Sequence, residues 1–365
     1  MSLENTWTPL LYTFYFLGQS PFPSTSTISK SYFKRLLLKL PILIVFCASM
    51  YVTIHFFNKE FYFAWGNEGL DVISFLLILS SLMTNLVITC RSLFRGSVCV
   101  QLQQSFSALE MEFQKLLPNR NVQFGKFRTV FLMKFFAVLI LYFVLVFAMS
   151  MSRIKAEYSH TSLVVVLAFI NDLCALQVVL YVDLTKFFLK TISHTFLNID
   201  GAEAKCVREA VIRTELLLST KKCYLSISKT VDKINEHFGP FLLAYIVQQF
   251  LAVSYDIFWV FVSKLSAGLW PSLDNGSVLL CDLLSLFLLL NSCHKMSFET
   301  QTIRSFLYED DYLIRGDGQR FLTLIINQPM KITTMHFFDL DRSFFAALTV
   351  GGITTAIVLV QFQNY

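Results

Sequence analysis

Charge is the most conspicuous shortage in this sequence. Asp, Glu, Lys and Arg make up 15% of the 365 residues, whereas soluble domains carry about a quarter. Apolar residues make up 55%, and phenylalanine alone occurs 38 times. One water-soluble core cannot bury so many apolar side chains, so the composition predicts a protein that crosses a membrane several times.

Sequence motifs of the common enzyme classes are also lacking. The six histidines are scattered, and no H-E-x-x-H, paired C-x-x-C, G-x-S-x-G or P-loop pattern occurs. We therefore expect no catalytic activity, no cofactor and no metal ion. The net charge of +5 follows from the basic loops that flank membrane helices, so no nucleic-acid partner is expected.

Seven segments are long and apolar enough to cross a bilayer of about 30 Å, which takes about 20 helical residues. The predicted membrane helices are residues 36–57, 72–90, 130–151, 162–184, 241–262, 278–294 and 344–362. The sequence therefore predicts an all-α, multi-pass membrane protein.

The distribution of basic residues predicts the orientation of these helices. Of the 30 Lys and Arg residues, only Lys59, Arg153, Lys155 and Lys264 fall outside one alternating set of loops. By the positive-inside rule, the N-terminus is then cytoplasmic and the C-terminus extracellular. A G-protein-coupled receptor has the opposite orientation. The one glycosylation sequon, at Asn275, falls in a predicted outer loop.

The two longest cytoplasmic connections have helical spacing of apolar residues. Gly239-Pro240 marks a helix junction at the end of the first one. We expect these connections to form a helical cytoplasmic layer, or else loose amphipathic helices on the lipid headgroups. The predicted division is a cytoplasmic segment 1–35, membrane helices in 36–184, a cytoplasmic anchor 185–240, membrane helices in 241–294, a second anchor 295–343, and a last helix with an extracellular end 344–365.

The last predicted helix has one small and polar stripe. At 100° per residue this stripe carries Ala347, Gly351, Thr354, Val358 and Gln361. Such a stripe is typical of close helix–helix packing. It is also what a helix that lines water would present.

The end of the chain resembles the signature of the insect gustatory receptors, which is Thr-Tyr, five hydrophobic residues and Gln-Phe. Here Thr354 and Thr355 precede the hydrophobic residues 356–360, and Gln361 and Phe362 follow. Thr355 stands where the signature has tyrosine. Residues 9–18 (PLLYTFYFLG), 234–243 (INEHFGPFLL) and 337–345 (FFDLDRSFF) also resemble the family.

The resemblance implies a ligand-gated, non-selective cation channel in the plasma membrane of a sensory neuron. Four subunits, identical or combined with other gustatory receptors, would surround a pore lined by the last helix. Gln361 and Phe362 would then form the gate, with Val358, Thr354 and Gly351 below it and Thr355 beside it. The ligand would be a small-molecule tastant that enters from outside. An odorant receptor subunit is the alternative, and a seven-helix transporter is a further one.

Three carboxyl groups lie within predicted membrane helices, where each costs about 2.5–3.5 kcal/mol on insertion scales. They are Asp172, Asp256 and Asp282, and Gln249 adds an amide. With Tyr255 and Trp259 at the rim, they are candidates for a ligand pocket. The alternative is that Arg153, Lys155 and Lys264 form structural ion pairs with them.

Overall fold

The computed structural model describes residues 68–94, 96–116, 124–152, 158–200, 207–266, 269–309 and 317–363, with Tyr12, Phe14, Leu40, Ile44, Cys47 and Tyr51. In this part of the chain the elements are α4 (Glu68–Phe94), α5 (Gly96–Leu116), α6 (Phe124–Ser152), α7 (Tyr158–Asp200), α8 (Val207–Ser266), α9 (Leu269–Glu309), α10 (Asp317–Asn327) and α11 (Arg342–Gln363). The prediction of an all-α fold is confirmed, because β pairing over these residues amounts to one isolated bridge.

Six of these helices are long and apolar enough to cross a membrane: α4, α6, α7, α8, α9 and α11. They contain six of the seven segments predicted from the sequence. The first predicted segment, residues 36–57, lies outside the described residues except for four helical positions with exposed side chains. Much of the apolar surface faces outward, since Met133 and Phe143 of α6 are 67% and 72% exposed. A bilayer would cover such a surface.

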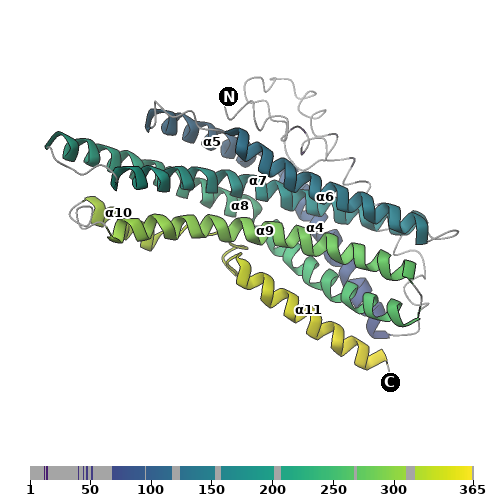
Figure 1. The fold of residues 1–365 in the computed structure, drawn as a ribbon. Coiled ribbons are helices and arrows are strands. Elements are labelled where there is room, and N and C mark those ends of the chain that lie inside the picture. Colours follow the sequence, from purple (N-terminus) through teal and green to yellow (C-terminus); the bar gives the residue numbers. More distant parts are fainter. Residues whose placement is uncertain are drawn as a thin grey trace.

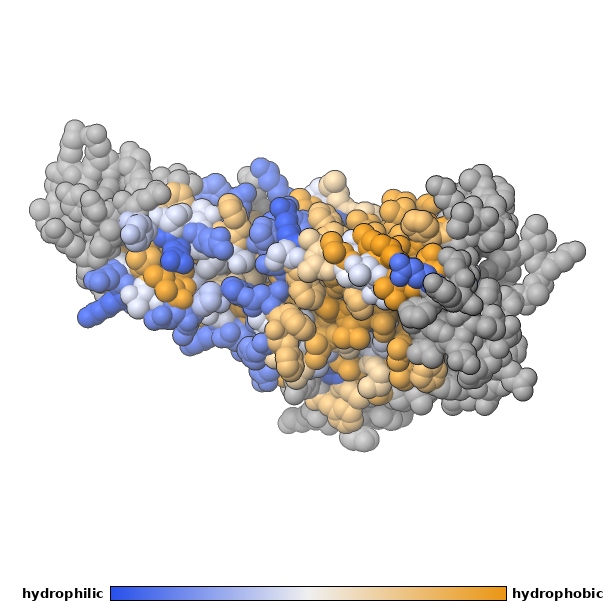
Figure 2. Space-filling model, turned by 90° about the horizontal axis from the view of Figure 1, so that it is seen from below, coloured by the Kyte–Doolittle hydropathy of each residue, from blue (hydrophilic) through white to orange (hydrophobic). Residues whose placement is uncertain are grey.

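The helices form a long bundle (Figure 1), and one end of it is polar and the other apolar (Figure 2). The helices α7, α8 and α9 have 43, 60 and 41 residues, and about 20 residues already span 30 Å. They therefore extend past the apolar region, and α5 and α10 lie beside their extensions. Figure 2 shows hydrophilic residues gathered over this part, here called the polar end, and hydrophobic residues over the other, the apolar end.

The helix junction expected at Gly239-Pro240 is not there, because α8 continues through Pro240 without a break. Proline inside a helix loses one hydrogen bond and costs about 3 kcal/mol. The burial of apolar side chains on both sides of Pro240 offsets this cost, since Phe238 and Phe241 are fully buried. A Cβ atom on Gly239 would lie 3.3 Å from the backbone nitrogen of Met335, so the helix also packs tightly there.

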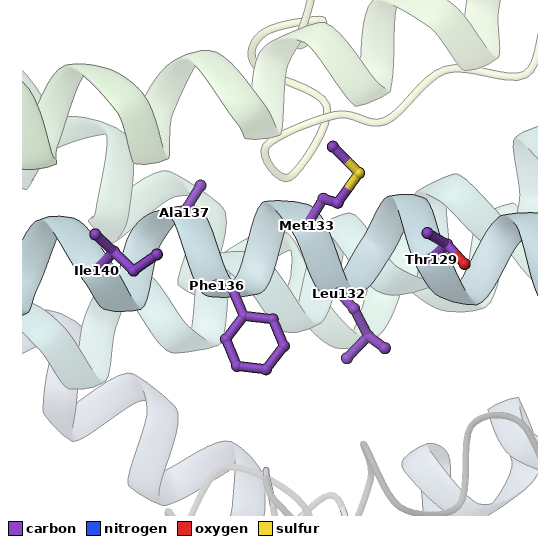
Figure 3. Close-up of a pocket in the computed structure, with 6 residues that line it drawn as sticks. All are labelled: Thr129, Leu132, Met133, Phe136, Ala137 and Ile140. Carbon is purple, nitrogen blue, oxygen red and sulfur yellow. The ribbon is translucent and has the colours of Figure 1, made fainter.

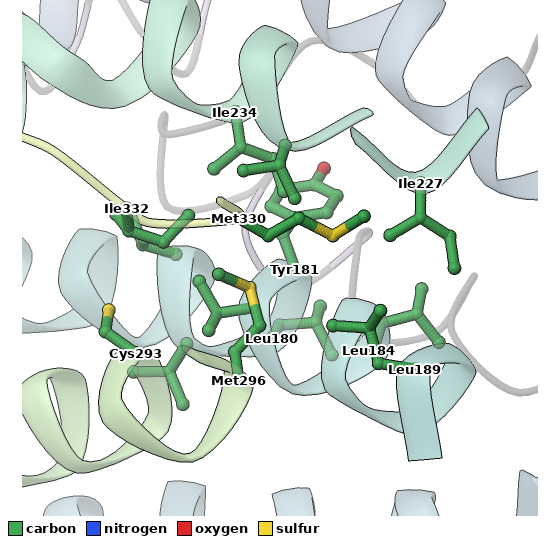
Figure 4. Close-up of a cluster of buried hydrophobic side chains, with 14 of the residues drawn as sticks. Leu180, Tyr181, Leu184, Leu189, Ile227, Ile234, Cys293, Met296, Met330 and Ile332 are labelled. Carbon is green, nitrogen blue, oxygen red and sulfur yellow. The ribbon is translucent and has the colours of Figure 1, made fainter. Parts of the chain in front are cut away.

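The largest hydrophobic core lies where α7, α8 and α9 run together toward the polar end (Figure 4). Leu180 and Leu184 of α7 meet Ile234 of α8 and Met296 of α9 in this core. Ile332, from the segment that leads into α11, also packs here. This core therefore joins the polar end to the start of the last helix.

Candidate functional site

A cluster of buried polar side chains lies within the apolar end, between α6, α7, α8 and α9. Its centre is Asp172 of α7, which is 1% exposed. The hydroxyl groups of Tyr142, Tyr245 and Ser285 donate hydrogen bonds to its carboxyl oxygens at 2.8, 2.8 and 2.7 Å. The Gln249 amide adds a longer contact of 3.4 Å. Three helices, α6, α8 and α9, thus supply donors to one carboxyl group of α7.

The other two carboxyl groups predicted for this site lie beside the first. Asp256 of α8 and Asp282 of α9 are 8% and 6% exposed, and their side chains are hydrogen-bonded to each other. Two carboxyl groups bond to each other only when one of them keeps its proton. The Gln249 amide nitrogen lies 3.5 Å from Asp282 Oδ1 and so connects this pair to Asp172.

Two oxygen atoms in this cluster are buried and have no hydrogen-bond partner: Oδ2 of Asp256 and Oε1 of Gln249. Most buried polar atoms in folded proteins have a partner, so each exception calls for an explanation. The structure therefore brings four of the six predicted ligand-binding residues together, and it leaves acceptors among them unused.

The predicted aromatic rim is placed differently. The Trp259 ring packs with Tyr255 and Phe258, at centroid distances of 6.0 and 5.7 Å. Together with Phe258 and Ala356, Trp259 belongs to a small hydrophobic cluster between α8 and α11. Trp259 therefore connects α8, which carries Asp256, to the last helix. The cations considered as partners, Arg153, Lys155 and Lys264, lie outside the described side chains.

The last helix, α11, packs through one side and exposes the other. Gly352 and Ala356 are buried against α8, and a Cβ atom on Gly351 would lie 3.1 Å from the Phe250 ring. Thr354, Val358 and Gln361 of the predicted pore stripe are exposed, whereas Gly351 and Thr355 are half-buried. The stripe thus lies at the edge of the exposed face, and Gly351 serves helix packing.

The hydroxyl groups of Thr354 in this stripe and of Thr355 beside it form hydrogen bonds within the helix. Thr354 and Thr355 donate hydrogen bonds of 2.9 Å to the carbonyl oxygens of Val350 and Gly351. Phe362 belongs to α11 by its backbone, but its side chain lies outside the described part. Asn275, expected in an outer loop, instead lies in the second turn of α9. Its glycosylation stays a prediction.

Two polar sites near the middle of the bundle were not predicted. Lys134 of α6 forms an ion pair of 2.5 Å with the buried Asp183 of α7 and donates to Ser292 of α9 at 2.8 Å. Lys186 also pairs with Asp183, at 3.1 Å. The sequence offered one indication, a lysine within the apolar run of α6.

Arg91 is the second such site. It is 5% exposed, donates to the Gln177 side chain at 3.4 Å, and lies 4.4 Å above the ring of Phe238. An aromatic face stabilises a buried cation. This arginine therefore joins α4 and α7 to the part of α8 next to Pro240.

A groove of about 410 Å³ follows α6, lined by Thr129, Leu132, Met133, Phe136, Ala137 and Ile140 (Figure 3). Its lining is almost entirely apolar and offers no group that would orient a polar ligand. The buried carboxyl cluster is the better candidate for a ligand site.

Comparisons with known proteins agree with this architecture. The family model described as "7tm Chemosensory receptor" matches residues 8–364, and the chain belongs to this family. No curated protein sequence matches significantly. The olfactory receptor OR5 of the insect Machilis hrabei, solved in complex with eugenol, superposes with a TM-score of 0.64 at 14% identity, covering 98% of each chain. Another structure of OR5 gives a TM-score of 0.56 at 12% identity, with the same coverage.

Proposed function

We propose that the chain is a subunit of a taste receptor, a ligand-gated, non-selective cation channel in the plasma membrane of a sensory neuron. Four copies, or this chain with other gustatory receptors, surround a pore lined by α11. A small-molecule tastant that binds among the outer halves of the other helices opens it. The polar end is cytoplasmic and holds the subunits together.

The exposed face of α11 carries this proposal. One side of the helix is buried against α8, while Val350 and Ile357 on the other are 62% and 53% exposed, beside exposed Thr354 and Gln361. A membrane helix facing only lipid has no need of an amide at its end, because a polar group in hydrocarbon is costly. In an assembly, this face would contact other copies through its apolar side chains and a water-filled pore through its polar ones. Such an assembly therefore accommodates both kinds of side chain.

The ligand site has a direct structural route to that helix. Asp256 of the carboxyl cluster and Trp259 of the α8–α11 contact are three residues apart on α8. A small shift of this part of α8 on ligand binding would therefore move the surface on which α11 rests. The cluster favours a polar or cationic tastant.

The gate is tested by whole-cell recording from cells that express this chain alone. Sugars, amino acids and bitter compounds are perfused on the parent and on the Gln361→Ala variant. We expect a ligand-evoked cation current whose open probability or ion selectivity changes in the variant, because Gln361 borders the pore. Gln104→Ala, an exposed glutamine on α5, is the matched control and leaves both unchanged.

Unchanged opening and selectivity in Gln361→Ala would rule out the gate. If the receptor is shown to be at the surface and gives no current, this chain alone does not form a channel opened by these ligands. The next experiment is then to co-express it with other receptors. An odorant receptor subunit is the second candidate, since the matched structures are of an olfactory receptor. Volatile compounds in the same panel separate the two functions.

A further inference from the structure

The buried carboxyl cluster has more hydrogen-bond acceptors than donors. Asp172 alone receives the hydroxyl groups of Tyr142, Tyr245 and Ser285 and the long amide contact from Gln249. An ionised carboxylate has about four acceptor positions, so Asp172 is satisfied without a proton or a cation. These three hydroxyl groups therefore donate to Asp172 and not to the other two carboxyl groups.

The pair formed by Asp256 and Asp282 shares at least one proton, and it carries one negative charge when no second proton is bound. Their mutual hydrogen bond uses that proton. The remaining donor is the Gln249 amide, at a long 3.5 Å from Asp282 Oδ1. Oδ2 of Asp256 and Oε1 of Gln249 receive no hydrogen bond, and Gln249 is 1% exposed. None of the ion pairs recorded among the described side chains involves these carboxyl groups.

These free acceptors match one class of ligand. A primary ammonium group carries three N–H donors and one positive charge. Oδ2 of Asp256, Oε1 of Gln249 and the weakly contacted Oδ1 of Asp282 can accept those three donors. The ammonium charge would also neutralise the carboxyl pair in a site shielded from water, where an unpaired charge is costly.

Aromatic rings beside the cluster favour the same ligand. Tyr142 packs edge-on against Phe169 at 4.8 Å, and Tyr245 stacks with Phe241 at 5.5 Å. Ring faces attract organic cations. A divalent metal ion fits less well, because calcium takes six to eight oxygen ligands, and no group of three or more metal-binding residues occurs in the part of the chain that is described.

We propose that Asp256, Asp282 and Gln249 form a binding site for the protonated amine of a small organic ligand. This inference rests on the proposed function, since it names the ligand class of that receptor. It differs from a general polar pocket because it requires a positively charged N–H donor. A neutral molecule of the same shape lacks both the charge and the extra donors.

The test measures binding without recording current. Purified full-length receptor is titrated at pH 7 with benzylamine and with benzyl alcohol, which has a similar shape but is neutral. Saturable binding is followed by the shift in melting temperature. We expect benzylamine to bind at least about tenfold more tightly than the alcohol, because its charge and hydrogen bonds are made in a buried site.

Variants then locate the site. Asp256→Asn and Asp282→Asn should abolish the preference for the amine, while Asp232→Asn, at an exposed carboxylate of α8, should keep it. Equal binding of amine and alcohol to the parent, or no saturable amine binding, overturns the proposal even if a variant fails to fold. A preference that survives both cluster variants overturns it as well.

This test distinguishes a failure of the amine site from a failure of the proposed receptor function. An amine that binds through Asp256 and Asp282 but never evokes a current supports the site and contradicts the receptor function. A current evoked by neutral tastants, with no amine binding, contradicts the site and leaves the receptor function standing.

Discussion

At the scale of single residues, Asp341 fixes where the last helix begins. Its Oδ1 atom accepts hydrogen bonds from the Ser343 hydroxyl at 2.7 Å and the Phe344 backbone nitrogen at 2.9 Å. These bonds favour the charged form and hold the pKa of Asp341 below its usual value, against a smaller opposing effect of burial. Because the folded-state pKa is lowered, the stabilisation is present above the unfolded-state pKa of about 3.9 and is lost as the pH falls through the folded-state value.

We expect Asp341→Ala to lower the free energy of unfolding by about 1 kcal/mol at pH 7, since α11 loses its N-cap. Asp341→Asn is the control and should keep most of the stability, because asparagine caps helices equally well. Melting of the purified receptor measures both. A difference between parent and Asp341→Ala that stays constant down to pH 3 would contradict the role of the charged cap.

The carboxyl cluster shows how far single residues can be predicted from sequence. Asp172, Asp256 and Asp282 stand out, because a carboxyl group in a membrane helix is costly. Their partners Tyr142, Tyr245 and Ser285 do not stand out, since tyrosine and serine are ordinary in such helices. Only the packing of α6, α8 and α9 around α7 brings them to Asp172.

At the scale of the helices, the close approach of α8 and α11 depends on Gly352. A Cβ atom there would lie 3.2 Å from Val253 and 3.4 Å from the Ser254 hydroxyl. We expect Gly352→Leu to cost about 1–3 kcal/mol of stability through overpacking and to change channel opening, because α11 is pushed off α8. Gly125→Leu is the control, since nothing lies within 4 Å of its Cβ position. Equal melting temperatures for the two variants would show that the α8–α11 contact accepts a larger side chain at no cost, which would contradict the prediction.

The ion pair between Lys134 and Asp183 joins α6 to α7. Asp183 is 3% exposed, and breaking a buried pair costs about 3–5 kcal/mol. Lys186 still contacts Asp183, so we expect Lys134→Met to cost about 3 kcal/mol, measured by unfolding of the purified receptor. Lys331→Met is the control and should cost less than about 1 kcal/mol, because the Lys331–Asp339 pair is nearly half exposed. Replacing Asp183 by Leu as well should recover part of the loss, and the absence of any recovery would contradict a buried-charge penalty.

Helix boundaries show where sequence reasoning fails. The apolar runs located six membrane helices, because their length is set by the bilayer. The Gly239-Pro240 pair predicted a junction that tertiary packing overrides, since Phe238, Phe241 and the Met335 backbone enclose that turn of α8. The helix α5 was not predicted, because its mixed composition has no apolar run to mark it.

At the scale of the whole molecule, the polar and apolar ends lie at opposite ends of one long bundle (Figures 1 and 2). Asn235 of α8 connects them, because its side chain bonds the backbone of Lys331 at 2.9 Å and Thr333 at 3.1 Å, just before α11. The polar end and the start of α11 are thus held together. A subunit contact at the polar end would therefore set the position of α11.

The same layout leads to a prediction about orientation. The helix α7 ends and α8 begins at the polar end, while α11 ends at the far end of the apolar region (Figure 1). If the basic polar end is cytoplasmic, as the positive-inside rule requires, the C-terminus emerges outside the cell. An epitope tag after Tyr365 should bind antibody on intact cells. The same tag in place of residues 201–206 should bind antibody only after the cells are permeabilised. In both cases, ligand-evoked current or surface biotinylation must show that the receptor has reached the plasma membrane. The reverse pattern would put the polar end outside, and α11 could then not present Gln361 to the extracellular mouth of a pore.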